Sequence, residues 1–262
     1  MTDPQIDDGL PAKIADMRRH QKDRVFALVH EGRKLWIKTA AVPRHRLSLA
    51  SQRLGAMLLG LPMLRPPREL SGSHGLAAEA AALGELAKAG WPVPPVLGLS
   101  PYWLVLGDAG HSVERWLNVE TDRSARRERI AACADLLRRL HQAGFWHGGA
   151  QIRNFYWAAQ GPGLLDMEDH ELPGMTLPEK QARDLLLFLY SLIRYDNAAD
   201  PILLPIARGL IGAARPEARQ ALAKLHRRLG PLLRAIAPLS SHGGRDLRQV
   251  VAAEKLLGAA LD

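Results

Sequence analysis

The sequence predicts an α+β fold of two unequal lobes, a small β-rich lobe followed by a larger helical one. Short runs of β-branched and aromatic residues fall within the first 107 residues, whereas helical spacing of apolar residues dominates from residue 112 onward. A chain of 262 residues is near the upper end of what one hydrophobic core supports, and it suits two lobes that share a cleft. We place the lobes at residues 10–107 and 108–262.

The first lobe opens with two runs of strand-forming residues, RVFALVH at 24–30 and KLWIKT at 34–39. Glu31-Gly32 joins them, and glycine supplies the positive φ of a tight hairpin turn. The alanine- and leucine-rich stretch 76–89 predicts a helix that ends at Gly90. The following run, PVPPVLGLSPYWLVLGD, predicts two short strands and a connector.

The second lobe is predicted to be mostly helical. The short, glycine-punctuated segment 106–111 is a suitable hinge between the lobes. A strand-and-loop interlude is expected at residues 145–169. The predicted helices cover residues 126–143, 179–194, 215–236 and 246–261.

The charge balance predicts attraction to anions. Lys and Arg number 35 against 27 Asp and Glu, which gives a net charge of +8 with histidine neutral. Such a field attracts a nucleotide, a nucleic acid or an anionic membrane surface, and does not choose among them. Only 5% of the residues are aromatic and no stacking or helix-turn-helix motif is present, so no nucleic-acid partner is expected.

Cysteine usage and hydropathy predict a cytoplasmic location. Cys133, the one cysteine, cannot form an internal disulfide, and it falls in a helical run where a small core residue is expected. The first residues lack the pattern of a signal peptide. The longest apolar runs are too short, or too broken by proline, to span a bilayer.

The segment LHQAGFWHGGAQIRNFYWAAQGPGLLDMED, residues 140–169, carries the chemistry. His147 and Asn154 lie on a loop that follows a helix end, and Asp166 follows an apolar strand. An amide and a carboxylate delivered by adjacent loops suit Mg²⁺, which prefers oxygen ligands. Phosphoryl transfer needs such a metal to neutralise charge on the β- and γ-phosphates.

This segment resembles the catalytic and metal loops of the bacterial lipopolysaccharide core kinases and Kdo kinases, which show LHxAGxxHGDxxxxNxL followed by LIDF(D/E). LHQAGFWHG matches, and Asn154 follows Gly149 by five positions, the family's spacing between its catalytic aspartate and its metal-binding asparagine. LLDMED matches the metal loop, with Asp166 as the metal aspartate. EAAALGELAKAGWPVPPVLGL and ARDLLLFLYSL resemble two further blocks, the second holding a buried aspartate, Asp184, that braces the catalytic loop. The resemblance covers residues 24–195, with five blocks in order.

The resemblance implies a protein-kinase-like fold with ATP and Mg²⁺ in the cleft. Lys38, in LWIKTA, would grip the α- and β-phosphates. Glu79 would pair with it from a helix, and Glu85 is the alternative partner. His147 would brace the metal loop through a hydrogen bond. The metal ligands would be Asn154 and Asp166.

Two departures from the family pattern bear on activity. Gly149 stands where the family has the aspartate that accepts the proton of the substrate hydroxyl, and glycine has no side chain for that task. Glu168, Asp169 and Gln151 are the nearby residues that could take it over, and the first two flank the metal loop. No glycine-rich loop precedes the hairpin at residue 24, so the phosphates lack the usual backbone lid.

The family implies an enzyme that phosphorylates a sugar of the lipopolysaccharide core or its precursor at the inner face of the cytoplasmic membrane. The alternative is an inactive pseudokinase that regulates a protein partner in envelope biogenesis. Retention of Lys38, Asn154 and Asp166 favours a nucleotide site still in use. The basic segment 44–68, around LGAMLLGLPML, suits contact with an anionic membrane, or it is an insertion whose apolar face packs on the neighbouring helix.

Overall fold

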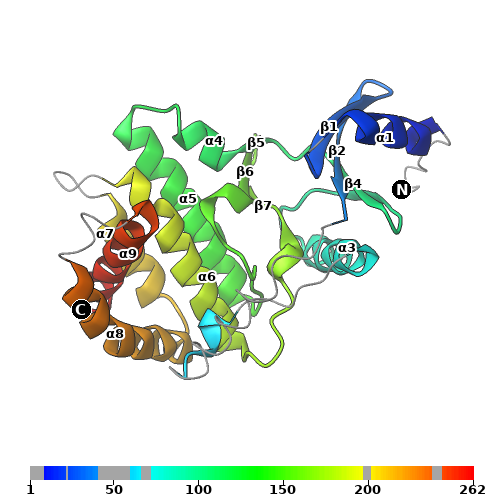
Figure 1. Ribbon diagram of the computed structural model, residues 1–262. Helices are drawn as coiled ribbons and strands as arrows, with labels where there is room; N and C mark the ends of the chain where they lie inside the picture. The colour runs from blue at the N-terminus through cyan, green and yellow to red at the C-terminus, as the bar shows by residue number, and fades with distance from the viewer. Residues whose placement is uncertain (1–8, 22, 41–59, 66–71, 197–201, 238–243) are drawn as a thin grey trace.

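The computed structural model describes residues 9–21, 23–40, 60–65, 72–196, 202–237 and 244–262. Helices predominate and the strands form small antiparallel sheets, which confirms the predicted α+β class. Figure 1 shows a sheet end, where the chain begins, and a helical end, where it finishes. The division of the chain at residue 107 stays a prediction, and the larger sheet does end at Gly107.

A four-stranded antiparallel sheet, in the order β1-β2-β4-β3, forms the sheet end. The predicted hairpin is confirmed, because β1 and β2 pair from His30–Arg33 outward across a two-residue turn. Glu31 and Gly32 have φ values of 49° and 72°, the two positive values that such a turn requires. The strands are β1 (Val25–His30), β2 (Arg33–Thr39), β3 (Val96–Leu99) and β4 (Trp103–Gly107).

Helices cover both faces of this sheet. The alternation of β4 sends Val105 to one face and Leu104 and Leu106 to the other. Val105 joins the cluster that holds Leu10 and Ile14 of α1 (Gly9–His20), a helix that the sequence did not predict. Leu104 and Leu106 join the cluster that holds the buried side of α3 (Ser73–Lys88), the predicted helix with its start three residues earlier.

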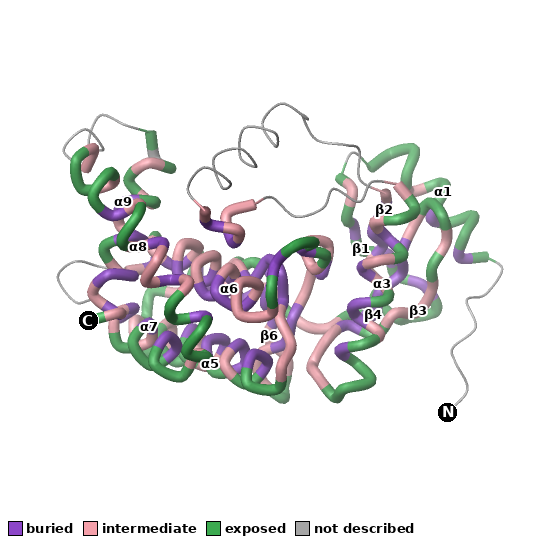
Figure 2. Tube along the Cα trace, turned by 90° about the horizontal axis from the view of Figure 1, so that it is seen from below, coloured by how far each residue is buried: buried purple, intermediate pink, exposed green. Residues whose placement is uncertain are grey.

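The helical end is built around α5 and α6, where Figure 2 shows buried residues concentrated. Cys133 lies in this core with no exposed surface, as predicted. The predicted helices all form, and the shorter α4 and α7 are additional. The helices are α4 (Val113–Leu117), α5 (Arg123–Gln142), α6 (Leu177–Leu192), α7 (Leu203–Gly212), α8 (Pro216–Ile236) and α9 (Arg245–Leu261).

A three-stranded antiparallel sheet lies where the two ends meet, in the order β5-β6-β7. It connects with the sheet end through the N–H of Leu164, which donates to the carbonyl of Pro92 (2.8 Å). Because β6 and β7 pair with Phe155 opposite Leu164, the loop before β6 and the segment after β7 emerge side by side. The strands are β5 (His111–Ser112), β6 (Phe155–Ala158) and β7 (Gly161–Leu164).

Most of the basic segment 44–68 lies outside the described residues. Its described part, residues 60–65, includes the short helix η1 (Pro62–Leu64). Met63 is buried there, and its carbonyl accepts a hydrogen bond from Arg183 of α6 (2.9 Å).

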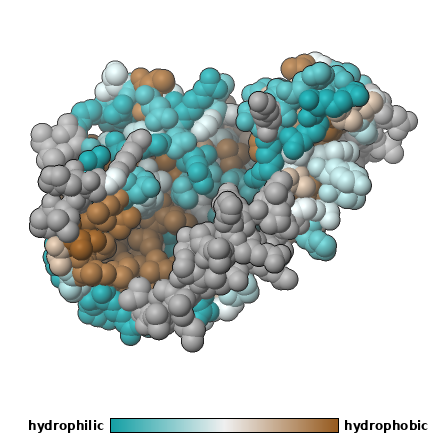
Figure 3. Space-filling model, in the orientation of Figure 1, coloured by the Kyte–Doolittle hydropathy of each residue, from teal (hydrophilic) through white to brown (hydrophobic). Residues whose placement is uncertain are grey.

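In the view of Figure 3, polar residues cover much of the sheet end, and apolar residues gather where α6, α8 and α9 meet. Within the described part of the chain, no helix combines the length and the apolar character needed to cross a bilayer.

Candidate functional site

A cavity of about 290 Å³ lies between the sheet end and the helical end. Its walls come from β1, β2, α3, the segment 107–112 and the two loops beside the small sheet. The four residues that the sequence predicted for nucleotide and metal binding all line it. They are Lys38, Glu79, Asn154 and Asp166.

Lys38 lies at the centre of a charge cluster in which it and Glu79 are buried and Asp166 and Glu168 are partly exposed. Its Nζ is 2.7 Å from Glu79 Oε1, 2.5 Å from Asp166 Oδ1 and 2.8 Å from Glu168 Oε1. The lysine side chain is 6% exposed. Oxygens of the three carboxylates lie within 4.8 Å of one another, so Lys38 neutralises negative charges that would otherwise repel.

The structure selects Glu79, and not Glu85, as the helical partner of Lys38. Glu79 is 1% exposed on the side of α3 that faces the cavity. Six residues rotate a helix by about 600°, which places Glu85 on another face. Glu85 is accordingly exposed.

The cluster shifts the ionisation of its members. Burial acts to lower the pKa of Lys38, but attraction to Asp166, Glu79 and Glu168 outweighs it and holds this pKa above its usual value. Burial raises the pKa of Glu79 to about 7, against the attraction of Lys38. Burial also acts to raise the pKa of Asp166, but Lys38 outweighs it and the pKa is lowered. Asp166 therefore carries its negative charge at neutral pH.

The raised pKa of Glu79 predicts a pH-dependent stability. A carboxyl whose folded pKa of about 7 exceeds its ordinary value of 4.5 stabilises the fold below pH 4.5, and that contribution is lost as the pH rises through 7. We expect the unfolding free energy of the wild type to fall by on the order of 3 kcal/mol across this range, relative to Glu79→Gln. Urea unfolding over a pH series measures it. Glu128→Gln, at an exposed carboxylate on α5, is the control, and equal pH profiles for all three proteins would contradict the prediction.

Asn154 and Asp166 lie on loops that hydrogen bonds tie together. The N–H of Leu165 donates to the carbonyl of Asn154 (2.8 Å), and Asn154 Nδ2 donates to the carbonyl of Gly149 (2.8 Å). Oδ1 is then the atom of this amide that could bind a cation. Asp166 adopts φ 61° and ψ 72°, a left-handed conformation that few residues other than glycine adopt and that is common at functional sites.

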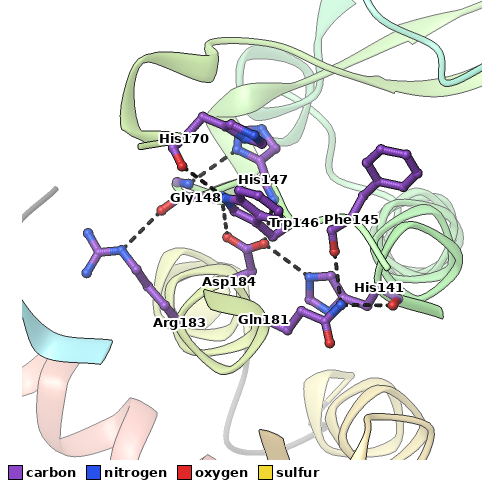
Figure 4. A network of polar contacts seen from close by, with 10 residues as sticks. His141, Phe145, Trp146, His147, Gly148, His170, Gln181, Arg183 and Asp184 are labelled. Carbon is purple, nitrogen blue, oxygen red and sulfur yellow. Dashed lines mark hydrogen bonds and ion pairs between the residues drawn. The ribbon is translucent and has the colours of Figure 1, made fainter. Parts of the chain in front are cut away.

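Asp184, on α6, holds the loop before Asn154 in place. Its carboxylate, fully buried on α6, accepts hydrogen bonds from the backbone N–H groups of His147 (2.6 Å) and Gly148 (2.8 Å). His141 Nε2 lies 3.1 Å from the same carboxylate. Burial acts to raise the pKa of Asp184, but the hydrogen bond and attraction of His141 outweigh it and the pKa is lowered. This is the bracing contact predicted for Asp184 (Figure 4).

Two neighbours of Asp184 on α6 complete this support, and the sequence did not indicate either. Gln181 Nε2 donates to the carbonyls of His141 (2.8 Å) and Phe145 (3.0 Å). Arg183 Nε donates to the carbonyl of Gly148 (3.1 Å). A spacing of three residues from Asp184 places Gln181 on the same helix face, which is the signal that could have found it.

His147 acts within its own loop. Its ring is fully buried and stacks against Phe155 at a centroid distance of 6.1 Å. Its Nδ1 accepts a hydrogen bond from the N–H of Gly149 (3.3 Å). The bond therefore stabilises the turn at Gly149, whereas the sequence had suggested a bond to the metal loop.

Of the side chains that could replace an aspartate at position 149, that of Asp169 lies nearest to the place of the missing β-carbon. A β-carbon added at Gly149 would lie 3.2 Å from Asp169 Oδ2 and 3.3 Å from Asp169 Cβ. Glu168 contacts Lys38 and Arg24 instead. Gln151 contacts the loop through its backbone N–H, which donates to the carbonyl of Gly149 (2.7 Å).

Among the cavity residues that sequence reasoning missed, three have aromatic or basic side chains. Trp36 lies two residues before Lys38, on the same face of β2, and its Nε1 donates to Asp108 Oδ1 (2.9 Å). Arg24, just before β1, pairs with Glu168, and Arg153 is an exposed cation at the cavity edge. The proximity of these residues to Lys38 and Asn154 in the sequence was the available signal.

Comparison with known proteins shows a distant relative but no family. No protein-family model matches the chain. A protein of Haemophilus influenzae, described as uncharacterized, is 26% identical to it over 190 residues. The aligned region covers 72% of this chain and 71% of that protein.

Proposed function

We propose that this chain is an ATP- and Mg²⁺-dependent phosphotransferase of the lipopolysaccharide kinase type, with a protein-kinase-like fold and with impaired or atypical activity. The observation that supports it best is the meeting of Lys38, Glu79, Asn154 and Asp166 at one cavity. Lys38 and Asp166 are 128 residues apart in the sequence, yet their side chains form a hydrogen bond. Protein kinases use a lysine, an asparagine and an aspartate to bind a nucleoside triphosphate and its metal ions, and the same residue types meet in this cavity.

The cavity offers suitable chemistry for the two halves of a nucleotide. Lys38, Arg24 and Arg153 supply positive charge for phosphates. Val25 and Leu106 supply apolar surface for a base. The volume of about 290 Å³ is close to the lower end of the range for small-molecule sites, about 300–1,000 Å³.

The polar groups fit Mg²⁺. Asp166 and Asn154 would hold it through oxygen atoms, the ligands this cation prefers, and the bound metal would neutralise phosphate charge. Glu79 keeps the Lys38 ammonium in place for the phosphates. Asp184 fixes the loop that carries Asn154 through two backbone hydrogen bonds.

The sequence resemblance supports a sugar hydroxyl of the lipopolysaccharide core or its precursor as the phosphate acceptor, at the inner face of the cytoplasmic membrane. One observation favours a second candidate function. Position 149 carries no carboxylate, as in a pseudokinase that binds nucleotide to present a surface to an envelope-biogenesis partner. Phosphotransfer requires nucleotide binding, whereas a pseudokinase can act with or without it, so that property is tested first.

ATP with Mg²⁺ should raise the melting temperature of the wild type, because a ligand at 100 times its Kd adds about 2.7 kcal/mol. Asp166→Asn should remove the Mg²⁺-dependent part of this shift, since it deletes the charge that would face the metal. Asp135→Asn, at a half-exposed carboxylate on α5, is the matched control. An unchanged Mg²⁺ effect in Asp166→Asn would refute the metal assignment, and no shift with ATP in the wild type would refute the proposed function.

A further inference from the structure

The space beside Gly149 is occupied by the carboxylate of another residue. A side chain at this position would begin with a β-carbon, and that atom would meet Asp169 Oδ2 at 3.2 Å. The same β-carbon would lie 3.7 Å from Asn154 Nδ2. Asp169, from the segment after Asp166, thus places its carboxylate beside the point from which a side chain at position 149 would start.

The backbone around Asp169 is held against this loop. Trp146 Nε1 donates to the carbonyl of His170 (3.0 Å), and the two rings stack with centroids 4.4 Å apart (Figure 4). Gly148 has φ 93°, and a β-carbon there would lie 2.2 Å from the carbonyl oxygen of Asp169. Only glycine permits so close an approach, so the two segments form one fitted unit.

A basic side chain lies near Asp169. Arg183 donates to the carbonyl of Gly148 from α6. Burial lowers the pKa of this arginine, and attraction to Asp169 and Asp184 opposes that effect. The guanidinium group therefore provides a positive charge near the Asp169 carboxylate.

The other two residues that could replace an aspartate at 149 are engaged elsewhere. Glu168 Oε1 lies 2.8 Å from Lys38 Nζ and also pairs with Arg24, so its charge belongs to the cluster around Lys38. Gln151 is an amide and cannot serve as a base near neutral pH. Asp169 is the candidate whose carboxylate lies beside position 149.

We propose that Asp169 replaces the aspartate absent from position 149 and is the catalytic base of this chain. The inference rests on the proposed function. The oxygen of the acceptor hydroxyl forms a bond to the γ-phosphorus of ATP, and its proton passes to the Asp169 carboxylate. The bond between the γ-phosphorus and the β–γ bridging oxygen breaks, and its electron pair leaves on ADP.

The proposal changes what an aspartate at position 149 would do. In Gly149→Asp, two carboxylates would compete for one space and repel each other. That variant alone should not gain activity, and its melting temperature should fall by roughly 2–8 °C. Adding Asp169→Gly removes the competing carboxylate and leaves the new one in place. The double variant should recover most of the melting temperature lost in Gly149→Asp and most of the turnover lost in Asp169→Gly.

The experiment measures three quantities on each variant: melting temperature, the shift produced by ATP with Mg²⁺, and ATP turnover. The acceptors for turnover are water, Kdo and heptose. Asp169→Asn should retain the ATP shift and lose turnover by about 10²–10⁴-fold. Glu171→Gln, at an exposed carboxylate on the same segment, should retain both. The other variants are Gly149→Asp, Asp169→Gly and their combination.

The outcomes separate this inference from the proposed function. If ATP with Mg²⁺ does not raise the melting temperature of the wild type, the proposed function is refuted. If the shift is present, unchanged turnover in Asp169→Asn, or no turnover in the wild type, would refute the role of Asp169 as base. Strictly additive melting temperatures in the double variant would refute the shared space, independently of any acceptor.

Discussion

Asp184→Ala should lower the free energy of unfolding by about 3–5 kcal/mol, the largest stability loss that we expect from removing one hydrogen-bond acceptor in this chain. The carboxylate is fully buried and accepts hydrogen bonds from the N–H groups of His147 and Gly148. Alanine leaves both donors without this partner in a place that water does not reach, and each such group costs about 1–3 kcal/mol. His141 loses its carboxylate neighbour as well.

Urea unfolding of the wild type and the variant at neutral pH measures this loss. Asp135→Ala is a suitable control, because Asp135 also pairs with basic groups, Arg138 and Arg139, but is 49% exposed. Exposed pairs contribute about 0–1 kcal/mol. If the two variants were equally stable, Asp184 would not be the brace of the loop.

The sequence predicted the elements that are determined by neighbouring residues. The hairpin follows from Glu31-Gly32 between two strand-forming runs, and the turn has the positive φ values expected of it. Helix α1 was missed because only Leu10 and Ile14 of its twelve residues are buried, and they pack in a cluster with residues of the strands β1, β2 and β4. Such a helix is stabilised by tertiary packing, which a local pattern does not display.

The same distinction applies to the site. The pairing of Lys38 with Glu79 was predicted from a family pattern, and the geometry brings these residues together with Asp166. The contact of Glu168 with Lys38 was not predicted, nor was the selection of Asp169 beside Gly149. Both depend on how residues 167–170 fold back after the left-handed turn at Asp166, a conformation that no residue pattern announced.

Lys38→Met should have a double effect, on stability and on nucleotide binding. A lysine in an open cleft would be a solvated charge, and the fold would tolerate its loss. The structure instead places the lysine, 6% exposed, among three carboxylates whose oxygens lie within 4.8 Å of one another. Removing it leaves the buried Glu79 and the partly exposed Asp166 without their shared counter-ion, which should cost about 2–4 kcal/mol near pH 8.

The pH dependence of this loss identifies its cause. Without Lys38, the pKa values of Glu79 and Asp166 should rise, because burial is then unopposed by its attraction. A raised folded pKa stabilises the fold below the ordinary carboxyl pKa and loses that effect as the pH rises, so the variant should lose less stability near pH 5 than near pH 8. Urea unfolding at both pH values, with Lys34→Met at an exposed lysine of β2 as control, measures the difference.

ATP affinity is then compared near pH 6, where the variant remains folded, and should be weakened in Lys38→Met alone. A stability loss independent of pH would show that lost packing, and not uncompensated charge, is responsible, and an unchanged ATP affinity would remove Lys38 from the nucleotide site.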